Sequence, residues 1–203
     1  MGKTIQLGIK RAFDVVVSIA ALVVLSPLIA LIAIAIKRDS PGSIFFVQER
    51  VGKDGKPFRA IKFRTMIVNA EKIGLGLEIA HDDARITRVG HVLRRWTLDE
   101  IPQLFNVLRN EMSVIGPRPT VQSQVERYTP WQRRRLTMKP GMAGWAWIHG
   151  RNNLAWSRRI ELDVWYVEHW SLWLDVKIFF IAVLILFRHE GVYGTDGIAR
   201  DFE

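Results

Sequence analysis

The sequence predicts a predominantly helical α+β protein: a compact domain with a short β-hairpin, preceded by an N-terminal membrane helix. Three observations indicate this class. Residues 13–36 are almost continuously apolar, two strand-like runs flank a turn at Asp54-Gly55, and most later segments repeat apolar residues at helical spacing. Because no internal repeat or low-complexity linker is present, we expect one domain over residues 41–203, behind an anchor formed by residues 1–40.

Composition narrows the class of protein further. The chain has 203 residues, 29 Lys and Arg against 20 Asp and Glu, a formal net charge of +9 and no cysteine. The lack of cysteine excludes a disulfide scaffold and Cys-ligated zinc, and an apolar share of 49% excludes a disordered chain. The positive excess indicates an anionic partner, which charge alone leaves open between nucleic acid, acidic lipid headgroups and a phosphorylated substrate.

The apolar stretch Phe13–Ile36 is long enough to cross a bilayer, which takes about 20 residues. A cleaved signal peptide has a shorter apolar core, followed by a small-residue cleavage site rather than by basic residues. Both ends of this stretch are basic instead, with Lys3, Lys10 and Arg11 before it and Lys37 and Arg38 after it. Basic flanks stay in the cytoplasm.

Ser26 and Pro27 interrupt the middle of this stretch. Pro27 has no amide proton to donate to the Val23 carbonyl, and its ring crowds the preceding turn. We expect the Ser26 hydroxyl to bond to the Leu22 carbonyl and to favour a bend. A helix that breaks here and leaves on the side it entered satisfies both basic flanks. The prediction is therefore a re-entrant helix-break-helix, with a kinked transmembrane helix as the alternative.

Short elements follow the anchor. The hairpin strands are expected at residues 44–50 and 58–66, and helices at 85–96, 100–108, 122–128, 129–140 and 156–170. Thr129 and Pro130 are expected to be the cap and the first residue of the fourth helix. The apolar run 178–187 is too short to span a membrane, and is either a core helix or an amphipathic helix lying in the interface. All eight tryptophans fall between Trp96 and Trp173, and tryptophan favours the lipid–water boundary.

The adjacent carboxylates Asp99 and Glu100 stand at a predicted helix start. Thr97 followed by Glu100 fits a capping box, whereas Pro102 fits a cap at Asp99 itself. Either assignment puts Asp99 near the positive end of a helix, which keeps a carboxylate ionised. Because adjacent residues cannot share one helix face, the pair is expected to divide two tasks: one carboxylate attacks while the other holds a cation. Helix capping alone is the alternative.

Cationic residues occur in motifs around this pair: Arg94 and Arg95 before it, Arg118 in a rigid Gly-Pro-Arg-Pro loop, and Lys62 and Arg64 on one face of the second strand. Arginine suits bidentate phosphate contact. The combination predicts either plain salt bridges or a site where Mg²⁺ and arginines neutralise a diphosphate, and the membrane anchor favours the second. Residues 133–135, three consecutive arginines, are expected to form a solvated or headgroup-facing surface.

Taken together, these motifs resemble the bacterial sugar transferases, which are monotopic polyprenyl-phosphate phosphoglycosyl transferases. The resemblance covers nearly the whole chain and is carried by Lys10–Asp14, Ser26-Pro27, Ile61–Met66, Arg94–Pro119, Pro140–Asn152 and Glu161–Ile178. A chain of this length would lack the additional N-terminal membrane helices of larger relatives.

The resemblance implies an Mg²⁺-dependent enzyme that moves a hexose-1-phosphate from a UDP-sugar to a polyprenyl phosphate. Asp99 matches the family's nucleophile, which would form a covalent phosphosugar-aspartate and release UMP. Glu100 matches its partner in the pair, so both carboxylates are candidate Mg²⁺ ligands. The substrate-contacting positions are matched by Lys62, Arg94, Arg118 and Arg151.

The implied location is the bacterial inner membrane, with the catalytic domain on the cytoplasmic face in contact with membrane lipids, at the start of glycan assembly. Nucleic acid becomes the least expected partner, and the sugar and the oligomeric state stay open. One departure affects donor selection: Trp147 and His149 stand where the family commonly has Gln and Asn. Two alternatives are a non-enzymatic basic membrane-surface module and an Mg²⁺-dependent lipid phosphatase.

Overall fold

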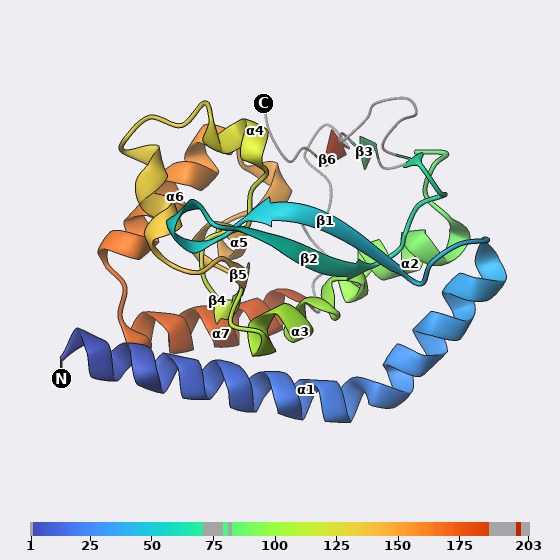
Figure 1. Cartoon of the computed structure of the whole chain (residues 1–203), viewed down its shortest axis with the longest axis horizontal. Helices are drawn as coiled ribbons and strands as arrows, with labels where there is room; N and C mark the ends of the chain where they lie inside the picture. Colours follow the sequence, from blue (N-terminus) through green and yellow to red (C-terminus); the bar gives the residue numbers. More distant parts are fainter. Residues whose placement is uncertain (1, 71–78, 81–82, 187–197, 200–203) are drawn as a thin grey trace.

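The computed structural model describes residues 2–70, 79–80, 83–186 and 198–199. It confirms a predominantly helical α+β fold with a short hairpin (Figure 1). In chain order the elements are α1 (Lys3–Asp39), β1 (Phe45–Val51), η1 (Lys53–Gly55), β2 (Pro57–Phe63), β3 (Ile79–Ala80), α2 (Arg88–Arg95), η3 (Leu98–Glu100), α3 (Gln103–Leu108), β4 (Ser113–Ile115), α4 (Gln122–Val125), η4 (Gln132–Thr137), β5 (Gly141–Ala143), α5 (Trp145–Ile148), η5 (Arg151–Asn153), α6 (Trp156–Glu168), α7 (Leu172–Leu186) and β6 (Ile198–Ala199).

The N-terminal helix α1 is continuous, so the predicted break is wrong. Pro27 lies inside a helix of 37 residues, and Figure 1 shows that its two halves run in different directions. The Ser26 hydroxyl donates to the Val23 carbonyl at 2.8 Å, not to the Leu22 carbonyl. Val23 carries the carbonyl that Pro27 leaves without an amide donor. The hydroxyl therefore satisfies the group that would otherwise interrupt the helix.

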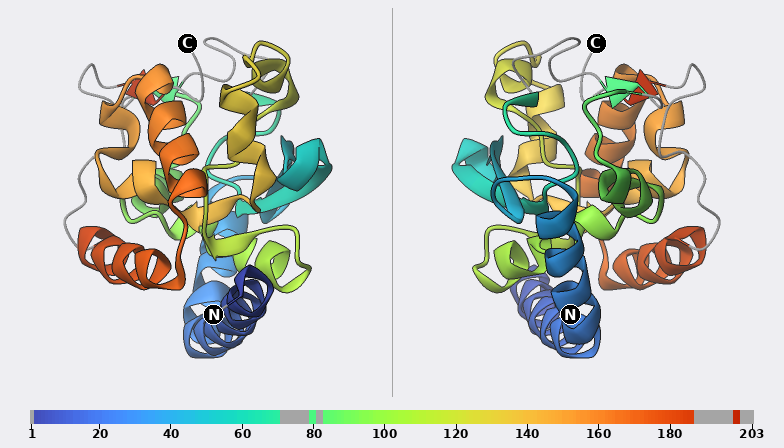
Figure 2. Two further views of the ribbon diagram at one scale, coloured as in Figure 1. Left: turned by 90° about the vertical axis from the view of Figure 1, so that its left-hand side faces the viewer. Right: turned by 90° about the vertical axis from the view of Figure 1, so that its right-hand side faces the viewer.

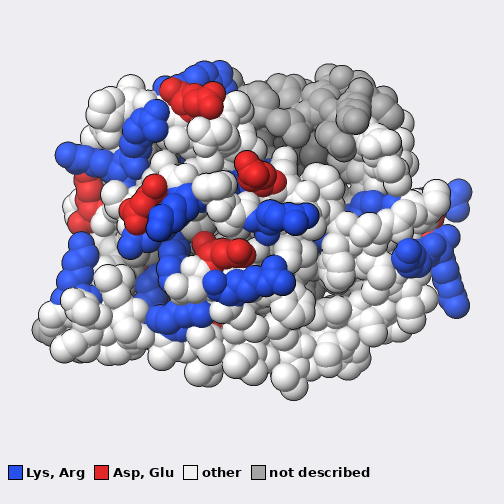
Figure 3. Space-filling model, in the orientation of Figure 1, with Lys and Arg blue, Asp and Glu red and all other residues white. Residues whose placement is uncertain are grey.

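Within the described residues, α1 is the one helix that is long and apolar enough to cross a membrane. Much of its apolar surface faces outward, and Val24 is 75% exposed. Figure 3 shows that the edge of the molecule occupied by α1 is largely free of charge. Exposed apolar side chains recur along the whole length of α1, whereas soluble proteins expose such residues singly.

Buried charges fasten α1 to the rest of the molecule. Lys10 Nζ donates to Asp175 Oδ2 at 2.7 Å and to the Ile115 carbonyl at 2.8 Å. One turn later along the helix, the Asp14 carboxylate accepts from the Ser113 hydroxyl at 2.9 Å. All these groups are buried, and a buried charge is tolerated only when it is paired and hydrogen-bonded. The N-terminal half of α1 is thus held in one position against β4 and α7.

The hairpin forms as predicted, with β1 antiparallel to β2. At its tip Asp54 and Gly55 both adopt positive φ, which explains the Asp-Gly pair at this point. Phe46 faces Lys62 across the ladder, and Arg50 faces Phe58. Since side chains alternate along a strand, Phe46, Lys62 and Arg50 project from the same face of the hairpin.

Two short strands, β4 and β5, form a parallel pair in the middle of the molecule. Gly116 follows β4, and its backbone amide donates to the Ala143 carbonyl at 2.8 Å. Gly141 packs so closely against Gly116 that a Cβ on either residue would collide with backbone. This close approach fixes the start of the Gly-Pro-Arg-Pro loop.

Three helices lie at the base of the molecule: α1, α3 and α7 (Figures 1 and 2). α7 begins six residues before the predicted apolar run and buries Leu174 and Ile178 in the core. Its outer side exposes the large apolar side chains of Trp173, Phe180 and Leu184. The hairpin and α6 lie on opposite sides above this base, with β4 and β5 between them (Figure 2).

Candidate functional site

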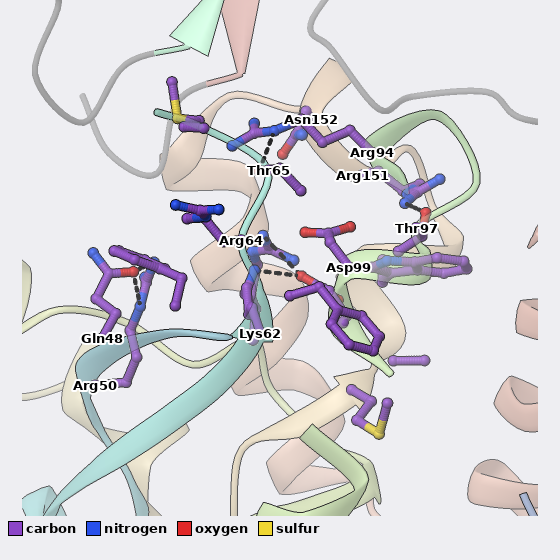
Figure 4. A pocket seen from close by; sticks show the side chains of 18 of the residues that line it. Gln48, Arg50, Lys62, Arg64, Thr65, Arg94, Thr97, Asp99, Arg151 and Asn152 are labelled. Carbon is purple, nitrogen blue, oxygen red and sulfur yellow. Dashed lines mark hydrogen bonds and ion pairs between the residues drawn. The ribbon is translucent and has the colours of Figure 1, made fainter. Parts of the chain in front are cut away.

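A cavity of about 430 Å³ opens between the hairpin, the η3 turn and α6 (Figure 4). Among the described residues, its lining carries eight lysine or arginine side chains against three carboxylates. The cations are Arg50, Lys62, Arg64, Arg94, Arg118, Arg135, Arg151 and Arg159, and the carboxylates are Asp99, Glu100 and Asp163. Such an excess of positive charge in a concave, partly desolvated site suits a strongly anionic ligand.

The structure brings the predicted site residues together. Asp99, Glu100, Lys62, Arg94, Arg118 and Arg151 all line this cavity. Ser26 and Pro27, predicted to break the anchor, lie in α1 and outside the cavity lining. Of the two cations predicted on one face of the second strand, Lys62 lies in β2 while Arg64 follows its end. The Arg64 guanidinium also donates to the carbonyls of Ser40 and Pro41, at the end of α1.

The local structure around the carboxylates differs from the sequence prediction. Thr97 adopts a left-handed conformation with φ 57° and makes no side-chain cap bond, so the capping box is not formed. Asp99 and Glu100 lie in the short 3₁₀ turn η3, and α3 begins only at Gln103. The expectation that the positive end of a helix keeps Asp99 ionised is therefore wrong. The neighbouring cations Lys62 and Arg94 act to lower its pKa instead, but burial leaves that pKa above the ordinary value.

Glu100 is bound by Lys62. Lys62 Nζ lies 2.7 Å from Glu100 Oε1, and Arg118 Nη2 lies 4.0 Å from the same oxygen. Burial acts to raise the pKa of Glu100, but the charges of Lys62 and Arg118 outweigh it and hold this pKa at about 2. Glu100 is therefore ionised at every pH at which the protein would function.

Asp99 points into the cavity from the opposite wall to Gln48 and Arg50 (Figure 4). Burial raises its pKa above the ordinary value, and the adjacent Glu100 charge adds to the rise, while Lys62 and Arg94 oppose it. The pKa values of two neighbouring carboxylates are thus pushed in opposite directions. Such a split is typical of paired groups with different chemical tasks, and a carboxylate of raised pKa is the better nucleophile of the two.

Specific contacts orient the side chains of two further cations of the cavity, Arg94 and Arg151. Arg94, in the last turn of α2, donates from Nε to the Thr65 hydroxyl at 2.9 Å. Arg151 donates to the Thr97 hydroxyl at 2.8 Å, and its guanidinium lies 4.4 Å from the centre of the Trp147 ring. Burial lowers the pKa of Arg151 to about 10, so it remains a cation. Trp147 is therefore a stacking surface for this arginine.

A buried ion pair holds the backbone of Arg118. Arg135 Nη2 donates to the Arg118 carbonyl at 2.8 Å and also binds the Asp163 carboxylate. Asp163 in turn accepts from the Arg118 amide. The prediction that residues 133–135 form a solvated face is wrong for Arg135, which is 1% exposed. The sequence shows that Arg159, Asp163 and Tyr166 fall on one face of α6, but it does not indicate that Arg135 is the partner of Asp163.

The donor set is compatible with magnesium. Mg²⁺ is typically held by one or two carboxylates together with substrate phosphate oxygens and water. Asp99 and Glu100 supply two adjacent carboxylates next to the cationic cavity. In the part of the chain that the structure describes, no group of three Asp, Glu, His or Cys side chains converges on a common point. The residues thus fit a cation shared with a phosphorylated ligand, and not a closed site made by protein alone.

A membrane-type helix beside a cationic cavity with two inequivalent carboxylates defines a class of protein that handles phosphorylated substrates at a lipid surface. Comparison with known proteins identifies the family. Residues 5–189 match the model of the bacterial sugar transferase family, and the chain belongs to that family.

Curated relatives agree with this assignment. The uncharacterized sugar transferase EpsL of Bacillus subtilis is 41% identical over 194 residues, covering 95% of this chain and 94% of that protein. The UDP-N-acetylgalactosamine-undecaprenyl-phosphate N-acetylgalactosaminephosphotransferase of Aeromonas hydrophila is 44% identical, covering 86% of this chain and 43% of that protein. The UDP-glucose:undecaprenyl-phosphate glucose-1-phosphate transferase of Escherichia coli is 39% identical, covering 91% and 41%. The chain therefore spans less than half of these two longer relatives.

Proposed function

We propose that the protein transfers a hexose-1-phosphate from a UDP-sugar to undecaprenyl phosphate and so begins the assembly of a bacterial glycan. The names of the relatives support both substrates. The observation that carries the proposal is the pair Asp99 and Glu100, whose pKa values are shifted apart inside a cationic cavity. An excess of arginine in a cavity suits anionic, phosphorylated groups.

The reaction proceeds in two displacements. In the first, an Asp99 carboxylate oxygen attacks the sugar-bearing phosphorus, the bond from that phosphorus to the bridging oxygen breaks, and UMP leaves. In the second, a phosphate oxygen of the lipid attacks the same phosphorus, and the bond to Asp99 breaks to regenerate the carboxylate. A covalent intermediate divides one difficult transfer into two easier steps. It also lets one cavity serve a soluble donor and a lipid acceptor in turn.

The surrounding residues have distinct tasks in this scheme. Lys62 keeps Glu100 ionised and in place, while Arg94, Arg118 and Arg151 offset the negative charge that develops on the phosphoryl oxygens. Glu100 and Asp99 would hold Mg²⁺, which when bound supplies further neutralisation of the diphosphate. Because the arginines are positioned in advance, little reorganisation accompanies the attack.

We further propose that residues 1–40 form a re-entrant anchor in the inner membrane, with residues 41–203 on the cytoplasmic face. The change of direction in α1 and its exposed apolar side chains support this arrangement (Figure 1). The basic groups at both ends of the apolar stretch favour a cytoplasmic location for both. Membrane lipids are then the direct surroundings of α1 and of the exposed side of α7, and no role for nucleic acid follows.

The covalent step is tested by mass spectrometry. Incubated with an accepted UDP-sugar and Mg²⁺, the protein should gain the mass of one sugar phosphate on the peptide that contains Asp99. Asp99→Asn should abolish both this adduct and UMP release. Asp54→Asn is the matched control, since Asp54 lies at the exposed hairpin tip and should leave turnover unchanged.

Three results would contradict the proposal. Full turnover in Asp99→Asn would exclude a covalent aspartate. Release of inorganic phosphate from the lipid, without sugar transfer, would indicate a phosphatase. Lipid binding that depends on salt and not on Asp99, without turnover of any UDP-sugar, would indicate a membrane-surface binding module.

A further inference from the structure

The cavity face of β1 changes character along its length. Phe46, Gln48 and Arg50 alternate along the strand and line the cavity, in the order apolar, polar and cationic. Phe46, at the apolar end, lies directly across the ladder from Lys62, the residue that binds Glu100. The cavity therefore has an apolar end close to the carboxylate pair and a cationic end farther along the hairpin.

Two further apolar residues extend this end of the cavity to the surface. Ile67 and Val68, in the segment after β2, line the cavity, yet they are 41% and 52% exposed. Phe46 is 39% exposed. We call Phe46, Ile67 and Val68 the apolar rim. These large apolar side chains both line the cavity and face outward, so the edge of the cavity has an apolar opening. Contact of this apolar surface with water is energetically unfavourable.

The apolar rim is fixed to the end of the membrane helix. Gly42 and Ser43, which follow α1, line the same cavity. A side chain at Gly42 would collide with Val68 and with Arg64. Lys37 Nζ donates to the Gly42 carbonyl at 2.9 Å, so the last turn of α1 holds this segment directly. The opening therefore lies where the chain leaves the apolar helix, at the level of its basic flank.

We propose that the isoprenoid chain of the lipid acceptor enters the cavity over the apolar rim, which places its phosphate among Lys62, Arg118 and Asp99. This inference rests on the proposed function and adds the route by which the acceptor reaches it. The rim packs against the segment that leaves α1, and Lys62 and Arg118 line the same cavity. A lipid with an apolar tail and a phosphate head matches both ends of that path. The cationic end near Arg50 is left for the soluble donor.

The test separates the two half-reactions. Ile67→Ser combined with Val68→Ser removes apolar contact for the chain while leaving the cations in place. Both residues are about half exposed, so folding should be retained. Formation of the aspartate adduct from the UDP-sugar alone should keep its normal rate. The KM for undecaprenyl phosphate should rise about tenfold, because apolar contact equivalent to about two methylene groups is lost. With geranyl phosphate, whose short chain makes few contacts beyond the cavity, the KM should change little.

Val92→Ser provides a matched control. Val92 is 56% exposed on α2 and is absent from the cavity lining. Its substitution should change neither KM. If the double variant loses its fold, Phe46→Ser in β1 repeats the experiment at the third residue of the apolar rim.

The outcomes are distinguishable. A normal adduct together with an unchanged KM for undecaprenyl phosphate would overturn the acceptor route and leave the proposed function intact. Equal increases in KM for long and short acceptors would place the effect at the phosphate rather than the chain, and would also overturn it. No adduct in the unmodified protein would overturn the proposed function itself.

Discussion

The buried pair of Arg135 and Asp163 should separate stability from catalysis. Arg135→Met leaves the Asp163 carboxylate, 1% exposed, without its counter-ion. Removing one partner of a buried ion pair costs about 3–5 kcal/mol, a large part of the roughly 5–15 kcal/mol that stabilises a typical domain. Since 1 kcal/mol shifts the Tm of a domain of this size by about 2–4 °C, we expect a fall of about 6–20 °C.

The double variant, Arg135→Met with Asp163→Leu, tests the catalytic part. Replacing both charges by apolar side chains is often neutral or stabilising, so the Tm should return close to its original value. The Arg118 backbone would still lack the hydrogen bonds that the pair supplies to its carbonyl and amide. Because Arg118 then loses its fixed position near Glu100, UMP release should stay reduced by about 100-fold.

Thermal unfolding in detergent and UMP release in nanodiscs measure the two effects. The adjacent exposed pair is the control: Arg134 and Glu168 lie 2.6 Å apart with side chains 58% and 37% exposed. Arg134→Met should therefore cost less than about 1 kcal/mol and leave turnover unchanged. An unaltered Tm in Arg135→Met would refute the assigned cost of the buried charge. Normal turnover in a stable double variant would refute the positioning of Arg118.

Two more predictions concern ionisation and topology. Asp99 must be ionised to attack, and its pKa is raised in the folded protein, so UMP release should be lost as the pH falls through that raised pKa. Lys62→Met removes a charge that lowers this pKa, so the acid limb of the pH profile of UMP release should move to higher pH. Glu100→Gln removes a charge that raises this pKa, so the acid limb of the residual activity should move to lower pH. Shifts of both variants in the same direction would contradict this account. For the anchor, a cysteine at Gly2 has open space and would be the only one in the chain. In a re-entrant anchor it should resist an impermeant thiol reagent on intact cells and react after lysis, and labelling of intact cells would exclude the re-entrant topology.

Much of the fold was readable because its signals are local. The apolar length of the anchor, the Asp-Gly hairpin tip and the cap at Thr129 each depend on neighbouring residues. The Thr129 hydroxyl accepts from the Gln132 amide at 3.2 Å, as the pattern predicts, although the element that follows is a 3₁₀ helix. The helix predicted from residue 85 begins at Arg88 because Thr87 caps it, its hydroxyl accepting from Gly90.

Apart from the predicted break in α1, the errors came where distant segments decide the conformation. Thr97 and Glu100 had the pattern of a capping box. In the structure, Arg151, 54 residues later, donates a hydrogen bond to the Thr97 hydroxyl, and Lys62 donates one to the Glu100 carboxylate. The pairing of β3 with β6 likewise joins segments that carry no mutual signal in the chain. Local propensity is a weak preference, and such tertiary contacts override it.

The sequence by itself determined that the chain has an apolar anchor, a hairpin and an adjacent carboxylate pair among arginines, because each of these features is a pattern of neighbouring residues. Only the tertiary structure decided which cations serve that pair. Among the three consecutive arginines, Arg135 is buried against Asp163 and Arg134 is exposed. The physical reason is that burial depends on what packs against a side chain, and Asp163 and the Arg118 loop reach Arg135 from positions that no local pattern specifies.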